Sequence, residues 1–146
     1  MDKYVLRTDG GARGNPGPAA LGAVLEEEGG KVIAAFGEYI GETTNNEAEY
    51  RAVIEGLKKL KSRIGKAKTK ASDVQVLSDS ELVVKQMTGK YKVENPKIQQ
   101  FFLQLWNLTL DFKKVSFTAV PREKNKAADR LVNEALDAQG AKRKLL

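Results

Sequence analysis

The chain has 146 residues, with 25 Lys and Arg against 19 Asp and Glu, a formal net charge of +6, and neither Cys nor His. This length suits one compact domain whose core needs no disulfide, and the missing Cys and His exclude a structural zinc site, a thiol nucleophile and a serine mechanism with an imidazole base. Because the N-terminus lacks a basic flank followed by an apolar run, and no stretch reaches about 18 apolar residues, we expect a cytoplasmic protein without a membrane span.

The first third of the chain predicts three antiparallel strands. Residues 4–8 alternate around β-forming side chains and run into a turn-rich segment, residues 9–18. The next two runs, residues 20–26 and 31–40, flank the Gly pair at 29–30, and such a pair is a strong hairpin signal.

A helix is expected after these strands. Thr44 and Glu47 fit a capping box, in which the Thr hydroxyl reaches forward to a free backbone N–H and the Glu carboxylate reaches back. An apolar stripe with helical spacing then marks the buried face, at Val53, Leu57, Leu60 and Ile64.

The end of this helix runs into a basic segment, residues 58–70, which holds seven Lys or Arg and no acid. This segment alone accounts for the positive net charge, because the rest of the chain is nearly neutral. Two interpretations are open: a solvated helix end and loop, or a contact surface for a polyanion, in practice nucleic acid.

The second half of the chain predicts two more strands and three helices. The strands are residues 74–77, expected to lie parallel to the first strand, and residues 115–120. The helices begin at Glu81, at Pro96 behind the cap Asn95, and after the cap Asn125.

We expect residues 1–140 to form a single α/β domain and residues 141–146 to form a disordered basic tail. Trp106 lies on the apolar stripe of the helix that begins at Pro96, so we expect its ring in the core. The sequence contains no internal repeat or linker that would divide the domain.

Four carboxylates stand where the predicted elements can bring them together. Asp9 follows the first strand and Asp79 the fourth, and the carboxyl ends of neighbouring parallel strands meet at one edge of a sheet. Glu49 and Asp129 fall in the first turns of two helices. Each residue alone also fits a turn former, a helix cap or a favourable charge at a helix N-terminus. Together they form an all-oxygen ligand set, which suits Mg²⁺ or Mn²⁺ and disfavours zinc.

Four short motifs stand in one order along the chain. They are Asp9-Gly10-Gly11 with Gly14-Asn15-Pro16-Gly17-Pro18, then Thr43-Thr44-Asn45-Asn46-Glu47-Ala48-Glu49, then Ser78-Asp79-Ser80, and finally Asn125 with Ala128-Asp129. In this order, over residues 3–138, they resemble the type 1 ribonuclease H family. The resemblance implies the ribonuclease H-like α/β fold, a five-stranded mixed sheet of order 3-2-1-4-5 with helices on both faces. It also implies hydrolysis of the RNA strand of RNA–DNA hybrids with two divalent ions, Mg²⁺ or Mn²⁺, leaving 5′-phosphate and 3′-hydroxyl ends.

The resemblance also assigns roles to individual residues. It implies that the catalytic and metal-binding carboxylates are Asp9, Glu49, Asp79 and Asp129, whereas Glu47 falls on a variable position and keeps its capping role. It places side-chain amides and backbone groups against the minor groove and the 2′-hydroxyls, which distinguish RNA from DNA without reading sequence, at Gly10, Gly11, Asn15, Asn45 and Asn46. Contacts with a phosphate of the DNA strand fall to Thr44 and Asn95, with Arg13 as a further phosphate ligand.

The chain departs from the family pattern in two ways. Many members carry a His on a loop before the last catalytic Asp, but residues 120–125 hold none. Proton handling must then differ, with three alternatives: Arg122 steadies the phosphate, Glu123 exchanges protons, or metal-bound water suffices. Many members also insert a basic, Trp-rich protrusion, whereas only residues 89–94 fill that interval here.

Two other functions remain open at this point. One is a catalytically silent module that binds hybrids, and the other is a resolvase or transposase core of the same superfamily. The intact set of four carboxylates argues against the first, and the Asn groups expected at the 2′-hydroxyls argue against the second. We expect the protein to be a monomer whose partner is an RNA–DNA hybrid duplex.

Overall fold

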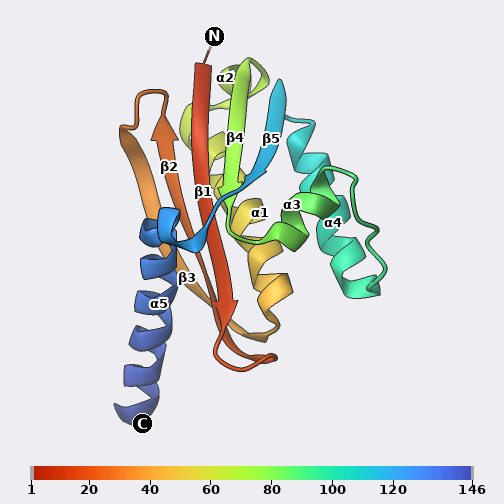
Figure 1. Cartoon of the computed structure of the whole chain (residues 1–146). Coiled ribbons are helices and arrows are strands. Elements are labelled where there is room, and N and C mark those ends of the chain that lie inside the picture. Colours follow the sequence, from red (N-terminus) through yellow and green to blue (C-terminus); the bar gives the residue numbers. More distant parts are fainter. Residues whose placement is uncertain (1, 146) are drawn as a thin grey trace.

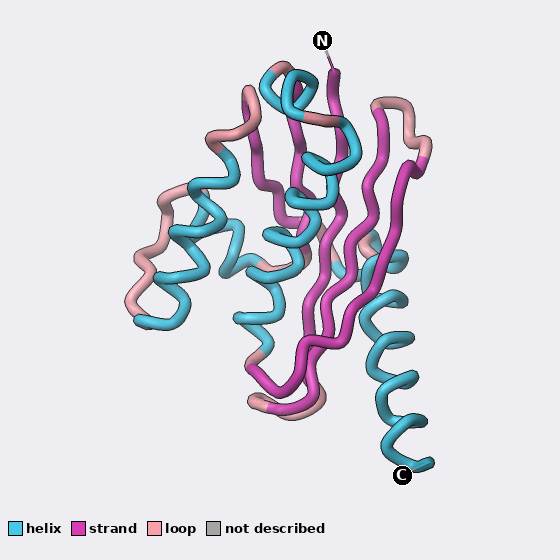
Figure 2. The backbone as a smooth tube through the Cα atoms, turned by 180° about the vertical axis from the view of Figure 1, so that it is seen from behind, coloured by secondary structure: helices cyan, strands magenta, loops and turns pink. Residues whose placement is uncertain are grey.

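The structure, a computed structural model, describes residues 2–145. Its elements are β1 (Asp2–Ala12), β2 (Gly17–Glu27), β3 (Val32–Thr43), α1 (Asn45–Ile64), α2 (Lys66–Lys70), β4 (Ser72–Ser78), α3 (Glu81–Met87), α4 (Pro96–Thr109), β5 (Lys114–Ala119), the 3₁₀ helix η1 (Arg122–Lys124) and α5 (Lys126–Leu145). The strands form one sheet of order β3-β2-β1-β4-β5. One face carries α1 and α4 and the other carries α5 (Figure 1, Figure 2). This arrangement confirms the predicted fold.

The central strand β1 sets the geometry of the sheet. It pairs antiparallel with β2 and parallel with β4, and β4 in turn pairs parallel with β5. Within the parallel pair, Thr8 is the register partner of Ser78. Asp9 follows Thr8 and Asp79 follows Ser78, so both carboxylates lie at the same edge of the sheet, as the sequence predicts.

The main core lies between the sheet and α1. Val53, Leu57 and Leu60 are fully buried, which confirms three positions of the predicted stripe, and they belong to one apolar cluster with Leu6 of β1 and Val76 of β4. The fourth position, Ile64, is half-buried at the edge of this cluster. Burial of these side chains fixes the rotation of α1, so that its first turns lie over the carboxyl end of β1.

On the opposite face, α5 approaches β2 very closely. A Cβ atom at Gly22 would lie 2.5 Å from the backbone oxygen of Ala128, so this contact requires glycine. Val132 and Leu136 of α5 pack there on Ala20 in a second, smaller apolar cluster. This close packing fixes the first turns of α5 near β1.

The capping box at α1 forms only in part. The Thr44 hydroxyl accepts the N–H of Glu47 at 3.2 Å, as predicted. The Glu47 carboxylate does not reach back. It accepts a hydrogen bond from the Thr43 hydroxyl and lies 2.8 Å from Nζ of Lys97 on α4. The Glu47 carboxylate therefore binds Lys97, which is distant in sequence, instead of the backbone N–H of Thr44. The half of the capping box predicted for Glu47 is wrong.

The expectation that Trp106 is a core residue is wrong. The residue is 46% exposed, and its ring stacks on Phe102 with 6.4 Å between the ring centroids. The buried positions of α4 are Ile98, Leu105 and Leu108, and the position next to Leu105 is turned by about 100° around the helix, toward solvent.

The C-terminal segment is more helical than the sequence predicts. The described part of the expected disordered tail, residues 141–145, continues α5, because Ala, Lys, Arg and Leu favour helix. The Arg143 guanidinium donates to the Tyr39 hydroxyl at 3.3 Å, which ties this part of α5 to β3. Residue 146 lies outside the described residues. Among these residues, no helix has the length and apolar character needed to cross a membrane.

The basic segment, residues 58–70, forms the end of α1 and the short helix α2. Lys61 pairs with Asp111 at 2.6 Å, and Lys58 with Glu55 at 3.5 Å. Figure 1 shows α2 beside the N-terminal end of β1, at the opposite end of the sheet from the carboxyl ends of β1 and β4. Its contact with a polyanion stays a prediction.

Candidate active site

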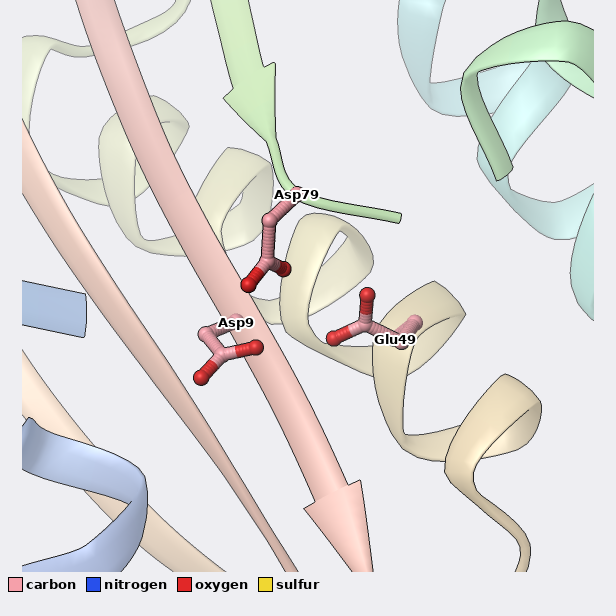
Figure 3. A group of neighbouring side chains, drawn as sticks. All are labelled: Asp9, Glu49 and Asp79. Carbon is pink, nitrogen blue, oxygen red and sulfur yellow. The ribbon is translucent and has the colours of Figure 1, made fainter. Parts of the chain in front are cut away.

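Three carboxylates from different elements converge at the carboxyl edge of the sheet. Asp9 comes from β1, Glu49 from α1, and Asp79 from the residue directly after β4 (Figure 3). One oxygen atom of each lies within 4.8 Å of those of the other two. They open into a cleft of about 850 Å³ that Asn46 and Arg122 also line.

Gly10 permits the approach that brings Glu49 to Asp9. A Cβ atom at Gly10 would lie 2.3 Å from the carbonyl carbon and oxygen of Ala48, so no other residue fits between β1 and α1. The N–H of Gly10 donates to Oε1 of Glu49. The sequence predicted a turn from residue 9 onward, but Asp9, Gly10 and Gly11 lie within β1.

The chain leaves β4 through a local hydrogen-bonded turn that directs Asp79 into the cleft. The Ser78 hydroxyl accepts the N–H of Ser80 at 3.0 Å, and the Ser80 hydroxyl accepts the N–H of Val83 at 3.2 Å as the cap of α3. The Ser80 side chain also acts to lower the pKa of Glu49, against the effect of burial. Ser80 was not among the predicted site residues, although a Ser before an apolar run is a recognisable cap signal.

The carboxylates are buried, and their charges oppose one another. Asp9 is 4% and Glu49 9% exposed. Burial raises the pKa of Asp9, and the neighbouring Glu49 and Asp79 raise it further. Burial also raises the pKa of Glu49, with a second contribution from Asp79. This site therefore favours a proton or a cation among its oxygens.

The donor set fits a hard divalent cation. Every candidate ligand atom is an oxygen, and Oδ2 of Asp79 is buried without a hydrogen bond, with the Arg122 guanidinium 3.4 Å away as its ion-pair partner. Mg²⁺ and Mn²⁺ prefer such ligands, whereas zinc prefers nitrogen and sulfur. The oxygen ligands at this site thus fit the divalent metal ions that the resemblance to ribonuclease H implies.

Asp129 lies beside Asp9 and outside the group of three. Its carboxylate makes the smallest of the contributions that raise the pKa of Asp9. Asn125 fixes this part of the chain through two hydrogen bonds. Its side-chain Nδ2 donates to the backbone carbonyl of Thr8 at 2.7 Å, and its backbone carbonyl accepts the N–H of Asp129 at 3.1 Å. Asn125 therefore stands at the start of α5 as predicted, but its side-chain amide binds β1 and not the helix end.

Two of the predicted substrate residues join the β1–β2 loop to the start of α1. Oδ1 of Asn45 accepts the N–H of Ala12 at 2.8 Å, and Oδ1 of Asn15 accepts the N–H of Asn45 at 3.0 Å. Each amide oxygen is used within the protein, so the Nδ2 groups remain as donors. Asn46 differs, because its Oδ1 is buried without a partner and the residue lines the cleft.

The remaining predicted contacts lie at two helix starts and on the loop. Thr44 caps α1, and Asn95 caps α4 by accepting two backbone N–H groups, which confirms both as caps. Arg13 does not face the cleft. Its guanidinium lies 2.7 Å from Asp137 and 3.4 Å from Asn133, both on α5.

Comparison with known proteins places this fold among relatives of one kind. A family model described as reverse transcriptase-like matches residues 7–135. A ribonuclease H from Caldicellulosiruptor saccharolyticus is 34% identical over 142 residues, covering 91% of this chain and 90% of that protein. The bifunctional protein Rv2228c from Mycobacterium tuberculosis is 43% identical over 137 residues, covering 93% of this chain. The chain spans about a third of that protein's length, 36%.

A solved structure supports the same grouping. The structure of LC11-RNase H1 in complex with an RNA/DNA hybrid superposes with a TM-score of 0.88 at 44% identity, covering 93% of this chain and 98% of that one. The strand order and the carboxylates at the sheet edge thus define the ribonuclease H-like class of folds. Within this class, the chain belongs to the type 1 ribonuclease H family.

Proposed function

We propose that this chain is an endoribonuclease that hydrolyses the RNA strand of RNA–DNA hybrids, with Asp9, Glu49, Asp79 and Asp129 as its catalytic and metal-binding carboxylates. The observation that carries the proposal is the convergence of three of these carboxylates within 4.8 Å at the mouth of an open cleft. The hybrid in the LC11-RNase H1 structure supports the class of substrate. The expected cofactor is Mg²⁺ or Mn²⁺, as two ions.

The chain's own groups can prepare the scissile phosphate for attack. Two bound divalent ions would supply the positive charge that activates a water and stabilises the leaving 3′ oxygen. Asp9, Glu49 and Asp79 hold their oxygens on one side of the cleft, where such charge is required. Of the two residues weighed in place of His, Arg122 lines the cleft and has its Nε 3.4 Å from Oδ2 of Asp79. This position favours Arg122 as the group that steadies the phosphate.

Selection of the RNA strand rests on asparagines in the β1–β2 loop and at the start of α1. Asn15 and Asn45 keep their Nδ2 donors free, and Asn46 keeps a buried acceptor without a partner. A 2′-hydroxyl both donates and accepts, so this combination suits a ribose and not a deoxyribose. The backbone of Gly10 and Gly11 lies beside these amides.

Cleavage of a defined set of duplexes tests this function. A labelled RNA–DNA hybrid, a DNA duplex and an RNA duplex are incubated with Mg²⁺ or Mn²⁺, and each strand is resolved by size. We expect cleavage of the RNA strand of the hybrid alone, with 5′-phosphate and 3′-hydroxyl ends. Efficient cutting of the DNA duplex would favour a resolvase-like nuclease, and hybrid binding without cleavage would favour a silent module. The monomeric state and the cytoplasmic location stay predictions from sequence.

A further inference from the structure

Glu47 is a buried carboxylate that the proposed chemistry does not use. Its side chain is 6% exposed, and its Oε1 lies 2.8 Å from Nζ of Lys97, whose own side chain is 68% exposed. Glu47 lies in the first turn of α1 and Lys97 in the first turn of α4. The ion pair therefore joins the N-terminal turns of two helices that are far apart in sequence. The Thr43 hydroxyl donates to the second carboxylate oxygen of Glu47 and holds it in place.

The same pair connects the two residues proposed to bind a phosphate of the DNA strand. The N–H of Glu47 donates to Oγ1 of Thr44 at 3.2 Å, and the N–H of Lys97 donates to Oδ1 of Asn95 at 2.9 Å. Each member of the ion pair is thus hydrogen-bonded through its backbone to one of those side chains. A continuous path runs from Thr44 through Glu47 and Lys97 to Asn95.

Each residue on the exposed side of this path has a donor left for a ligand. The Thr44 hydroxyl accepts a backbone N–H, so its proton is free to donate. Oδ1 of Asn95 accepts from Lys97 and Ile98, which leaves its Nδ2 group. The Lys97 ammonium has three N–H groups and directs one toward Glu47. The hydroxyl, the amide and the ammonium that this path connects are donors suited to a phosphate.

We propose that Lys97 is the cationic contact for a phosphate of the substrate backbone, and that Glu47 is the positioning residue that holds Lys97 at that place. This inference rests on the proposed function. A free lysine side chain loses much rotamer freedom when it binds a phosphate, whereas Lys97 is already restrained by a buried carboxylate. Restraint before binding lowers the entropic cost of association.

The direction in which one substitution changes the affinity for the hybrid distinguishes a positioning role of Glu47 from simple charge neutralisation. Glu47→Gln keeps the volume of the side chain and removes its charge. If Glu47 only neutralised Lys97 or repelled the phosphate, this change would strengthen hybrid binding. If Glu47 positions Lys97, the change weakens binding, although it makes the surface more positive.

The test measures kcat, KM and the salt dependence of KM on an RNA–DNA hybrid, with thermal unfolding recorded for every variant. We expect Lys97→Met to raise KM about fivefold and to reduce the salt slope by about one, as for one lost phosphate contact. The effect on kcat should be small, since the reacting phosphate lies at the carboxylates. Lys97→Arg should restore most of the affinity. Lys31→Met, an exposed lysine in the β2–β3 turn, is the matched control and should leave KM unchanged.

Glu47→Gln should raise KM in the wild-type background and leave it unchanged in the Lys97→Met background, because it acts through Lys97. Unchanged KM and salt slope in Lys97→Met would overturn the inference even if Glu47→Gln fails to fold, since Lys97 is exposed. A lower KM in Glu47→Gln would overturn the positioning role. A wild-type chain that does not cleave hybrids would contradict the proposed function itself, and the inference would fail with it.

Discussion

The Nε atom of Arg122 lies 3.4 Å from Oδ2 of Asp79, at the mouth of the carboxylate cleft. The charges of Asp79 and Asp9 raise the pKa of Arg122, so the guanidinium remains charged beside them. In a chain without His, this is a cation that the 3₁₀ helix η1 brings to the place where the phosphate is expected. The relationship leads to the first prediction.

Arg122→Ala should lower kcat about tenfold with a smaller change in KM, because a cation beside the phosphate stabilises charge that develops in the transition state. Arg122→Lys should recover part of the rate. Glu123→Gln is the matched control, since Glu123 is the exposed neighbour and does not line the cleft. Steady-state kinetics on a hybrid check this. A wild-type rate for Arg122→Ala would remove Arg122 from the site, and a slow Glu123→Gln variant would favour Glu123 as the proton-exchanging group.

Asn15 of the β1–β2 loop and Asn45 at the start of α1 should control the preference for RNA. Replacing Asn15 and Asn45 with Ala should slow cleavage of hybrids, because two donors toward the 2′-hydroxyls are lost. The same change should reduce the preference for ribonucleotides over deoxyribonucleotides. Competition between a hybrid and a chimeric substrate with few ribonucleotides measures the preference. Asn107→Ala, at an exposed position on α4, is the control. An unchanged preference in the double variant would mean that other groups recognise the ribose.

Gly10 should tolerate no side chain. In Gly10→Ala the new Cβ would lie 2.3 Å from the carbonyl of Ala48, so β1 and α1 must separate and the melting temperature and the activity should both fall. Gly140→Ala provides the contrast, since a Cβ there meets nothing within 4 Å and α5 should gain about 0.5–1 kcal/mol. Thermal unfolding of both variants checks the pair. A fully stable and active Gly10→Ala variant would contradict the close approach.

The stability of the metal-free protein should fall as the pH rises. The folded state raises the pKa of Asp9 and of Glu49 through burial and mutual repulsion, so above the ordinary carboxyl pKa of about 4 it binds more protons than the unfolded state. Raising the pH from about 4 through neutral therefore lowers the free energy of unfolding. Urea titrations with a chelator should show this decline, and Mg²⁺ should reduce it. A metal-free protein that gains stability over this pH range would contradict the raised pKa values.

Local patterns in the sequence predict most of the elements and the convergence of the carboxylates. Asp9 and Asp79 could be placed together because each follows a strand and parallel strands end at one edge. The ion pair of Glu47 with Lys97 could not be predicted, because it depends on how α4 packs against α1 and leaves no local signal. Trp106 was misplaced for a related reason, since a stripe of mixed apolar residues does not specify which of two adjacent positions faces the core.

The central claim is that the carboxylates form the catalytic site, and Asp79→Asn tests it most directly. This substitution replaces one carboxylate oxygen by an NH₂ group with almost no change in shape. Asp73→Asn makes the same exchange at the other end of β4 and serves as the control. With saturating Mg²⁺ and a labelled RNA–DNA hybrid, Asp79→Asn should bind the hybrid and fold like the wild type but lose at least about a thousandfold in single-turnover cleavage rate, while Asp73→Asn keeps its rate. Wild-type cleavage by a folded Asp79→Asn variant would contradict the assignment of the carboxylates as the catalytic site.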